Sequence, residues 1–301
     1  MIDAELPTAW LLESPDPAIR RLAAREFLGE AGADDGVLES PLVQTLLVER
    51  DVHPYAKWSG AHWRLVSLVE LGIPAGEPRA LAAAETVLAW LTGRGHRSAI
   101  RKIAGRVRRC ASQEGNALAV CARLGLADDE RVELLARSLV DWQWPDGGWN
   151  CDRRPEAHRS SFHESLAPAW GLHEYAAATG AVWARAAADR AAELFLSHRL
   201  FRSLRSGEVI NPVWLEPHYP PFWHYDVAQA LLVLARMGKH RDARASEARG
   251  ALAARQGRDG LWAAARAWWR RPGAKGSNVE VVDWGQRPSA MVTLNALRVL
   301  V

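Results

Sequence analysis

The sequence has few cysteines: Cys110, Cys121 and Cys151 are three thiols among 301 residues. An odd and sparse set argues against a disulfide framework and favours a reducing, cytoplasmic location. The N-terminal residues lack a basic stretch followed by an apolar one, so we expect no signal peptide. No apolar run approaches the roughly 20 residues that span a bilayer, so we expect no transmembrane segment and leave peripheral membrane contact open.

The sequence also lacks an alternating strand pattern and a large charge imbalance. The net charge is +3 at pH 7 and the basic side chains are mostly Arg, a bias typical of a GC-rich genome, so we expect no nucleic-acid partner. Tryptophan, in contrast, is abundant, with 15 residues. Each Trp brings a large apolar ring and an N–H that needs a partner, so this number predicts a large aromatic-lined interior.

One pattern recurs along the chain, an apolar helical stripe that ends at a glycine. Copies cover residues 62–72, 116–125, 165–180 and 227–238, and a last copy covers 291–301. Glycine suits the left-handed C-cap of a helix. Repeats about 50 to 60 residues apart fit one helix pair each.

Helices with a broader polar face are expected between these copies. Their apolar residues recur at helical spacing over 79–90, 129–141, 181–200 and 241–255, and another helix is expected over 16–28. The alternation predicts one all-α domain over residues 1–301, an α/α toroid of about five to six helix pairs with inner and outer rings. Helices within 1–50 would form a cap or the first pair. An open solenoid is the structural alternative.

Two loops share the pattern Gln-x-x-Asp-Gly-x-Trp, at residues 143–149 and 256–262. Asp-Gly suits a tight turn, and the Gln and Trp side chains can tie an outer helix end to the next turn. These segments resemble the QW motifs of squalene–hopene and oxidosqualene cyclases. That superfamily also contains class II diterpene cyclases and protein prenyltransferase β-subunits, and the resemblance covers essentially the whole chain as a repeat pattern.

The resemblance implies an isoprenoid or terpenoid cyclase or a prenyltransferase-like enzyme with a small hydrophobic ligand. The cyclase acid motif Asp-x-Asp-Asp-Thr is missing, and Asp226 stands at the comparable point. A carboxylic acid beside a hydrophobic cavity can donate a proton, although an N-terminal helix cap explains Asp226 equally well. The other candidate catalytic residues are His224, Tyr225, Glu164 and Asp152.

Aromatic rings can stabilise carbocations in such a cavity, and ordinary packing is the alternative for each ring. The candidate substrate-binding residues are Trp58, Trp149, Phe162, Trp170, Trp223 and Trp284. Protein prenyltransferases hold zinc through Asp, Cys and His from neighbouring inner-helix ends. Cys110, Cys151 and His163 offer such ligands, so zinc is a candidate cofactor and magnesium stays open. A partner subunit also stays open, because prenyltransferase β-subunits work with one.

Other functional classes remain open at this point. A toroid can bind a hydrophobic ligand or a glycan without chemistry, and polysaccharide lyases and glycosidases also use toroids with carboxylates at the mouth. Glu174 and Glu216, with Glu164 and Asp152, keep the glycan interpretation open. The basic segment 94–109 could hold a diphosphate or form a solvated helix face, and the Arg-rich segment 266–271 could cover the cavity mouth.

Overall fold

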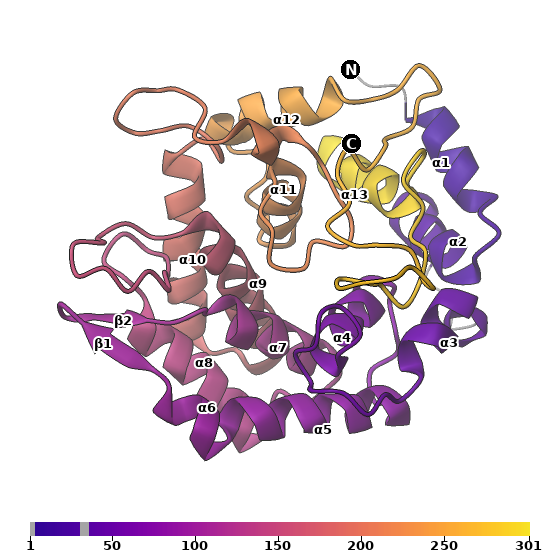
Figure 1. The fold of residues 1–301 in the computed structure, drawn as a ribbon. Helices are drawn as coiled ribbons and strands as arrows, with labels where there is room; N and C mark the ends of the chain where they lie inside the picture. Colours follow the sequence, from indigo (N-terminus) through magenta and orange to yellow (C-terminus); the bar gives the residue numbers. More distant parts are fainter. Residues whose placement is uncertain (1–3, 31–35) are drawn as a thin grey trace. The chain divides into compact units, whose positions relative to one another are not determined.

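The computed structural model describes residues 4–30 and 36–301, and it is mostly helical (Figure 1). The predicted all-α class is therefore confirmed, with a two-stranded hairpin as the single sheet among the described residues. None of the described helices is long and apolar enough to cross a membrane. The chain divides into two compact units, unit 1 with residues 1–74, 201–222 and 226–301, and unit 2 with residues 75–200 and 223–225.

Unit 2 is built around two apolar helices that lie side by side, α7 (Ser112–Arg123) and α9 (Phe162–Thr179). Around them pack α5 (Pro78–Thr92), α8 (Glu130–Trp142) and α10 (Val182–Ser197), each of which buries one stripe of residues. The short helix α6 (Arg94–Ser98) precedes the hairpin of β1 (Arg101–Ile103) and β2 (Arg106–Arg108).

Two glycines allow α7 and α9 to approach closely. A Cβ atom at Gly115 would overlap the backbone nitrogen of Pro168, and one at Gly171 would overlap the carbonyl oxygen of Gly115. Both residues are in helices, where glycine is otherwise unfavourable. Their cost in helix propensity is therefore offset by the close packing of the two backbones.

Unit 1 has the same two kinds of helix. The apolar ones are α4 (Ala61–Glu70), α11 (Val227–Arg236) and α13 (Ala290–Leu300), each buried along most of its length. The others are α1 (Glu5–Leu12), α2 (Pro17–Ala23), α3 (Pro41–Leu47) and α12 (Ser246–Ala253). Short helical turns complete the unit at Ala24–Leu28, Val37–Glu39, Pro212–Leu215 and Ala243–Ala245.

The predicted glycine ends are confirmed. Gly72, Gly125, Gly180 and Gly238 follow α4, α7, α9 and α11 with φ of 81°, 86°, 74° and 71°, which is the left-handed region. The hairpin, in contrast, differs from the expectation of no strands. Its turn residues Ala104 and Gly105 have φ of 49° and 76°, as in a type I′ turn. Three-residue strands are too short to show an alternating pattern in the sequence.

The first Gln-x-x-Asp-Gly-x-Trp segment ties α8 to α9 within unit 2. Gln143 Nε2 donates to the carbonyl of Gly147 at 2.8 Å, which closes the turn. Trp149 Nε1 donates to the carbonyl of Leu139 in α8 at 2.8 Å. The Trp149 backbone N–H donates to Ser165 Oγ in α9 at 2.9 Å.

The second segment repeats these contacts within unit 1. Gln256 Nε2 donates to the carbonyl of Gly260 at 2.8 Å, and Trp262 Nε1 donates to the carbonyl of Leu252 in α12 at 2.9 Å. The Trp262 backbone N–H donates to Thr293 Oγ1 in α13 at 3.1 Å. We call each copy a QW tie, meaning residues 143–149 with α8 and α9, or residues 256–262 with α12 and α13. Each tie joins the last turn of an amphipathic helix to the first turn of an apolar one, the role expected of the Gln and Trp side chains.

Candidate metal centre

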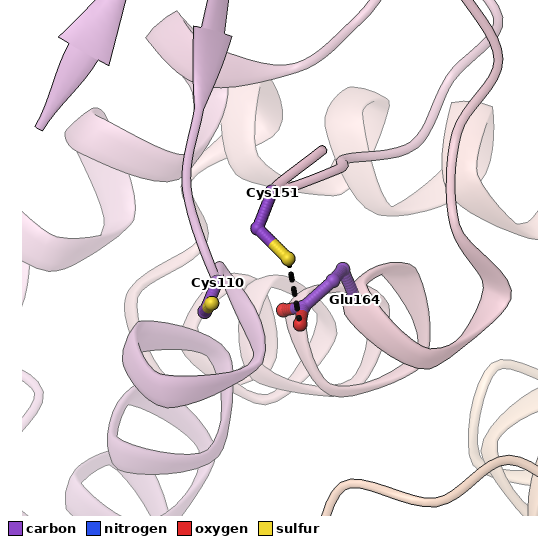
Figure 2. A group of neighbouring side chains, drawn as sticks. All are labelled: Cys110, Cys151 and Glu164. Atoms are coloured by element: carbon purple, nitrogen blue, oxygen red, sulfur yellow. Dashed lines mark hydrogen bonds between the residues drawn. The ribbon is translucent and has the colours of Figure 1, made fainter. Parts of the chain in front are cut away.

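Three potential metal ligands converge in unit 2. Cys110 lies in the segment that leads into α7, Cys151 lies in the loop after Trp149, and Glu164 lies in the first turn of α9 (Figure 2). One donor atom of each lies within 4.8 Å of the other two. Cys151 Sγ lies 3.6 Å from Glu164 Oε1, the contact drawn as a dashed line in Figure 2.

Backbone hydrogen bonds hold the three segments together. The N–H of Arg109 donates to the carbonyl of Asn150 at 3.2 Å, one residue before each cysteine. The N–H of Ser161 donates to the carbonyl of Trp149 at 2.8 Å, which fixes the start of α9 on the QW tie. The two cysteines and the carboxylate are therefore held by backbone contacts that do not depend on their own side chains.

Glu164 is 9% exposed and is held by α7. The Ser112 N–H and hydroxyl both donate to Glu164 Oε2, at 3.1 and 2.9 Å, and among the described residues Glu164 forms no ion pair. Burial raises the pKa of the Glu164 carboxyl, and the nearby carboxylate of Glu114 raises it further, against the opposing effect of the Ser112 bonds. A buried carboxylate beside thiols and a second carboxylate favours the approach of a cation.

The two thiols interact with each other. Cys151 donates its S–H to Glu164 Oε1 at 3.6 Å. Interaction between the two thiols lowers the pKa of Cys110 and raises that of Cys151, with burial and Glu164 also raising the latter. Cys110 is therefore the thiol that more readily becomes a thiolate, the form that binds metals.

A second carboxylate lies next to this group. Glu114 is 1% exposed, and its Oε1 accepts from His96 Nε2 and from Arg109 Nε, both at 2.9 Å. Its Oε2 is buried and has no hydrogen-bond partner among the residues that the structure describes. The negative charge of Glu114 opposes ionisation of both Cys110 and Glu164 and so contributes to a higher pKa of each. Arg109, the ion-pair partner of Glu114, has the opposite effect on Cys110, whose pKa is lowered overall.

The donor set fits zinc. With Zn–S bonds of about 2.3 Å and Zn–O bonds of about 2.1 Å, sulfur and oxygen ligands of a tetrahedral ion are about 3.6 Å apart. The observed separation of Cys151 Sγ and Glu164 Oε1 is also 3.6 Å. Two thiols disfavour magnesium, which prefers oxygen ligands in octahedral geometry. Three protein ligands are the number typical of a catalytic zinc, whose fourth position is open to water or substrate.

A surface depression adjoins the centre. Asn150 and Asp152, on either side of Cys151 in the chain, line it together with residues 154 and 156–160, and its volume is about 370 Å³. Asp152 pairs with Arg154 at 2.6 Å, and this pairing lowers the pKa of Asp152 to about 2. Arg154 and Arg159 both line the depression, together with the carboxylates of Asp152 and Glu156.

Most other candidates in unit 2 form an aromatic cluster. The ring of Phe162 packs edge-on against Phe195 and Tyr225, with centroids 5.4 and 5.1 Å apart. His163 Nδ1 accepts from the Tyr225 backbone N–H at 3.0 Å, and His163 is outside the group of three donor atoms within 4.8 Å. Trp223 stacks on His224 at 3.9 Å. The structure thus brings together Cys110 and Cys151 of the expected metal ligands, with Glu164 in place of His163.

Asp226 lies in unit 1 and is fully buried. It is the N-cap of α11, where Oδ1 accepts from the Gln229 N–H at 2.8 Å. Its Oδ2 accepts from the His218 N–H at 3.0 Å and lies 2.5 Å from His218 Nδ1. The helix-cap interpretation is confirmed, whereas proton donation by Asp226 stays a prediction.

The remaining candidate tryptophans are buried, and each packs against another ring or donates a hydrogen bond. Trp58 stacks on Phe222 at 3.7 Å, and Trp284 packs edge-on against Tyr219 at 4.9 Å, both within unit 1. In unit 2, Trp149 belongs to the QW tie, and Trp170 Nε1 donates to Glu174 at 2.8 Å. These contacts match the ordinary-packing alternative for each ring and do not test substrate binding.

The basic segment 94–109 is divided between hairpin and helix, so it is not a single helix face. Arg108 is 4% exposed, packs on the Trp144 ring at 4.5 Å and donates to the carbonyl of Ala157 at 3.0 Å. Arg109 binds Glu114. These two cations therefore have internal partners.

Sequence reasoning gave no role in the site to two residues that shape the centre. Ser112 positions Glu164, and Glu114 sets the local charge, yet a serine and a glutamate at the start of a helix are ordinary in a sequence. The available signal was the position of Glu114 on the apolar helix α7, where a carboxylate needs a partner.

Comparisons with known proteins give no match. No protein-family model matches the chain. No curated protein and no solved structure matches it either. The likeness of its loops to QW motifs therefore stays a resemblance.

Proposed function

We propose that this protein is a zinc enzyme of the transferase type that acts on an isoprenoid-like substrate. The observation that carries the proposal is the convergence of Cys110, Cys151 and Glu164 at the start of two neighbouring apolar helices. A zinc ion bound there would supply a Lewis acid that activates a thiol or water at its fourth position.

The residues of the chain have distinct parts in this proposal. Cys110 and Cys151 supply the thiolates, and Glu164 supplies a carboxylate oxygen. Ser112 holds the other oxygen of Glu164, which orients the carboxylate toward the sulfurs. Glu114 adds negative charge that favours a cation.

The depression beside Cys151 supports an anionic group on the substrate. Arg159, which lines the depression together with the Asp152–Arg154 ion pair, suits the phosphate oxygens of a prenyl diphosphate. Aromatic rings such as those buried in unit 2 are a type of side chain that suits an apolar substrate chain. Each of these rings, however, already packs against another ring.

We further propose that the helices form the α/α toroid expected from the sequence. Two observations support this arrangement. Each unit has the same two kinds of helix, apolar and amphipathic, and each contains a QW tie with matched hydrogen bonds. Repetition of one helix-pair unit is the basis of such folds.

The test is metal content followed by transfer activity. Protein purified without chelators or a His-tag column should contain one zinc per chain by elemental analysis. Cys110→Ser, Cys151→Ser and Glu164→Gln should each lose most of the metal. Cys121→Ser is the matched control, because Cys121 is 1% exposed inside α7 and outside the group of donor atoms.

Activity then separates a transferase from a binding protein. Zinc-loaded protein is incubated with prenyl diphosphates of increasing length and thiol or water as acceptors, and products are identified by mass spectrometry. Product that disappears with chelator and in Cys151→Ser supports the transferase. Wild-type protein that binds no zinc would overturn the proposal, and zinc without any turnover would leave a metal-containing ligand-binding protein.

A further inference from the structure

The two cysteines of the centre are also placed to react with each other. Their sulfurs lie within 4.8 Å, and both side chains are half-buried and so accessible to a small oxidant. The hydrogen bond from Arg109 to Asn150 joins the two backbones one residue before each cysteine. Cys121, in contrast, is enclosed in α7.

We propose that Cys110 and Cys151 form a reversible intramolecular disulfide when the protein meets a peroxide. A disulfide needs the sulfurs at about 2 Å, with Cα atoms roughly 4.4 to 6.8 Å apart. The hydrogen bond between Arg109 and Asn150 brings the two backbones together one residue before each cysteine. Rotation about the χ1 bonds of two half-exposed side chains can supply the remaining approach.

The reaction balances with peroxide as the oxidant. The thiolate of Cys110 attacks one peroxide oxygen, so an S–O bond forms, the O–O bond breaks and hydroxide leaves. The sulfur of Cys151 then attacks the sulfenic sulfur, so the S–S bond forms and the S–O bond breaks. The departing hydroxide takes the thiol proton as water. Two thiols are oxidised by two electrons, and the peroxide is reduced to water.

The disulfide would also act on the metal centre. A disulfide sulfur is not a thiolate ligand, so oxidation removes two of three ligands and releases the ion. This consequence rests on the proposed function, whereas the disulfide itself does not. The same two residues would then make the enzyme active when reduced and metal-free when oxidised.

The experiment uses the full chain in two forms, stripped with a chelator and loaded with zinc. Each is treated with hydrogen peroxide, alkylated, and digested with trypsin and a glutamate-specific protease, because cleavage after Glu114 separates Cys110 from Cys121. Mass spectrometry without reduction then identifies the linked peptides. Cys121→Ser is the matched control and should behave as the wild type.

The expected result is a Cys110–Cys151 link in most stripped molecules, reversed by dithiothreitol, with Cys121 still alkylated. Slower linkage in the zinc-loaded form, at least tenfold, with release of the ion, supports the effect on the metal. Sulfinic or sulfonic acids, or links between chains, in place of the internal link would overturn the disulfide. An internal link that zinc does not slow would overturn the metal site and leave the disulfide standing.

Discussion

Ser112 binds one oxygen of Glu164 twice, through its backbone N–H at 3.1 Å and its hydroxyl at 2.9 Å. The first residue of α7 therefore fixes a carboxylate in the first turn of α9. The other oxygen of Glu164 is left to face Cys151. The position of a potential metal ligand thus depends on a side chain that does not itself bind the metal.

Replacing Ser112 with Ala should weaken the centre while the fold persists. The backbone bond remains, so we expect a loss of about 1 to 2 kcal/mol in the free energy of unfolding. Zinc affinity should fall about 10- to 100-fold, as for other residues that orient ligands. Chemical denaturation and competition with a chelator measure the two effects. Ser98→Ala, whose hydroxyl bonds to Gly95 on an exposed turn, should change neither.

The close approach of α7 and α9 predicts that adding one methyl group at Gly115 strongly destabilises the fold. Gly115→Ala would place its Cβ against the backbone of Pro168, so we expect a loss of roughly 2 to 4 kcal/mol and a displaced Ser112. Gly250→Ala in α12 is the matched control, because nothing lies within 4 Å of its Cβ position. That variant should be stabilised by up to about 1 kcal/mol. Equal stabilities for the two variants would contradict the packing described for α7 and α9.

The two QW ties predict that substitution of Trp149 and of Trp262 lowers the free energy of unfolding by similar amounts. Each indole is nearly fully buried and donates to a carbonyl ten residues earlier, at 2.8 and 2.9 Å. Substitution by Phe should cost about 2 to 4 kcal/mol in both cases, because a buried carbonyl loses its donor and a cavity forms. Thermal unfolding measures the losses. The half-buried Trp10, changed to Phe, should lose less than either.

Asp226 should stabilise the fold because it both caps the N-terminus of α11 and pairs with His218. Asp226→Ala removes an N-cap and leaves a buried histidine without its carboxylate, so we expect a loss of about 2 to 4 kcal/mol. Asp129→Ala removes the more exposed cap of α8 together with a surface ion pair to Arg131, and should cost about 1 kcal/mol. Asp226→Asn keeps an acceptor for the cap, so lost turnover in a stable Asn variant would support the predicted proton donor.

Burial of Glu280 predicts that the stability of the fold decreases as the pH rises. It is 3% exposed, and burial raises its pKa from 4.5 to about 7. Because the folded pKa is above the unfolded value, its contribution to stability is complete below pH 4.5 and is lost as the pH rises through 7. Glu280→Gln should therefore be more stable than the wild type at pH 8 by up to about 3 kcal/mol, and equal to it near pH 4. Denaturation curves at both pH values test this, with the exposed Glu156→Gln as control.

Much of the secondary structure could be predicted because helical periodicity is local. The stripes over 62–72, 116–125 and 227–238 correspond to α4, α7 and α11, and their glycines are left-handed as expected. The predicted helix over 16–28 begins at Pro17 after the cap Asp16 and continues through a π-helical turn to Leu28. The hairpin was not predicted, because an Ala-Gly turn between three-residue strands carries little signal.

The candidate centre was only partly predictable, because it depends on distances between segments far apart in the chain. Cys110 and Cys151 stood out as rare residue types beside helix starts. Glu164 was expected as a catalytic acid and His163 as the ligand. A one-residue difference at the start of α9 decides which side chain faces the sulfurs, and the position of the QW tie sets that start. Sequence periodicity does not fix such a rotation.

The QW ties also explain how loops of different length can serve the same fold. In both copies the tryptophan carbonyl accepts from a serine N–H just before an apolar helix, at 2.8 Å for Ser161 and 2.9 Å for Ser289. Ser161 is 12 positions after Trp149, whereas Ser289 is 27 positions after Trp262. The segment between these two anchored points is therefore 15 residues longer in the second copy (27 against 12 positions), while the same hydrogen bond holds the start of the apolar helix in both. Such a segment can differ in length and in the functional residues that it carries, as Cys151 in the first copy illustrates, while the contacts at its two ends stay the same.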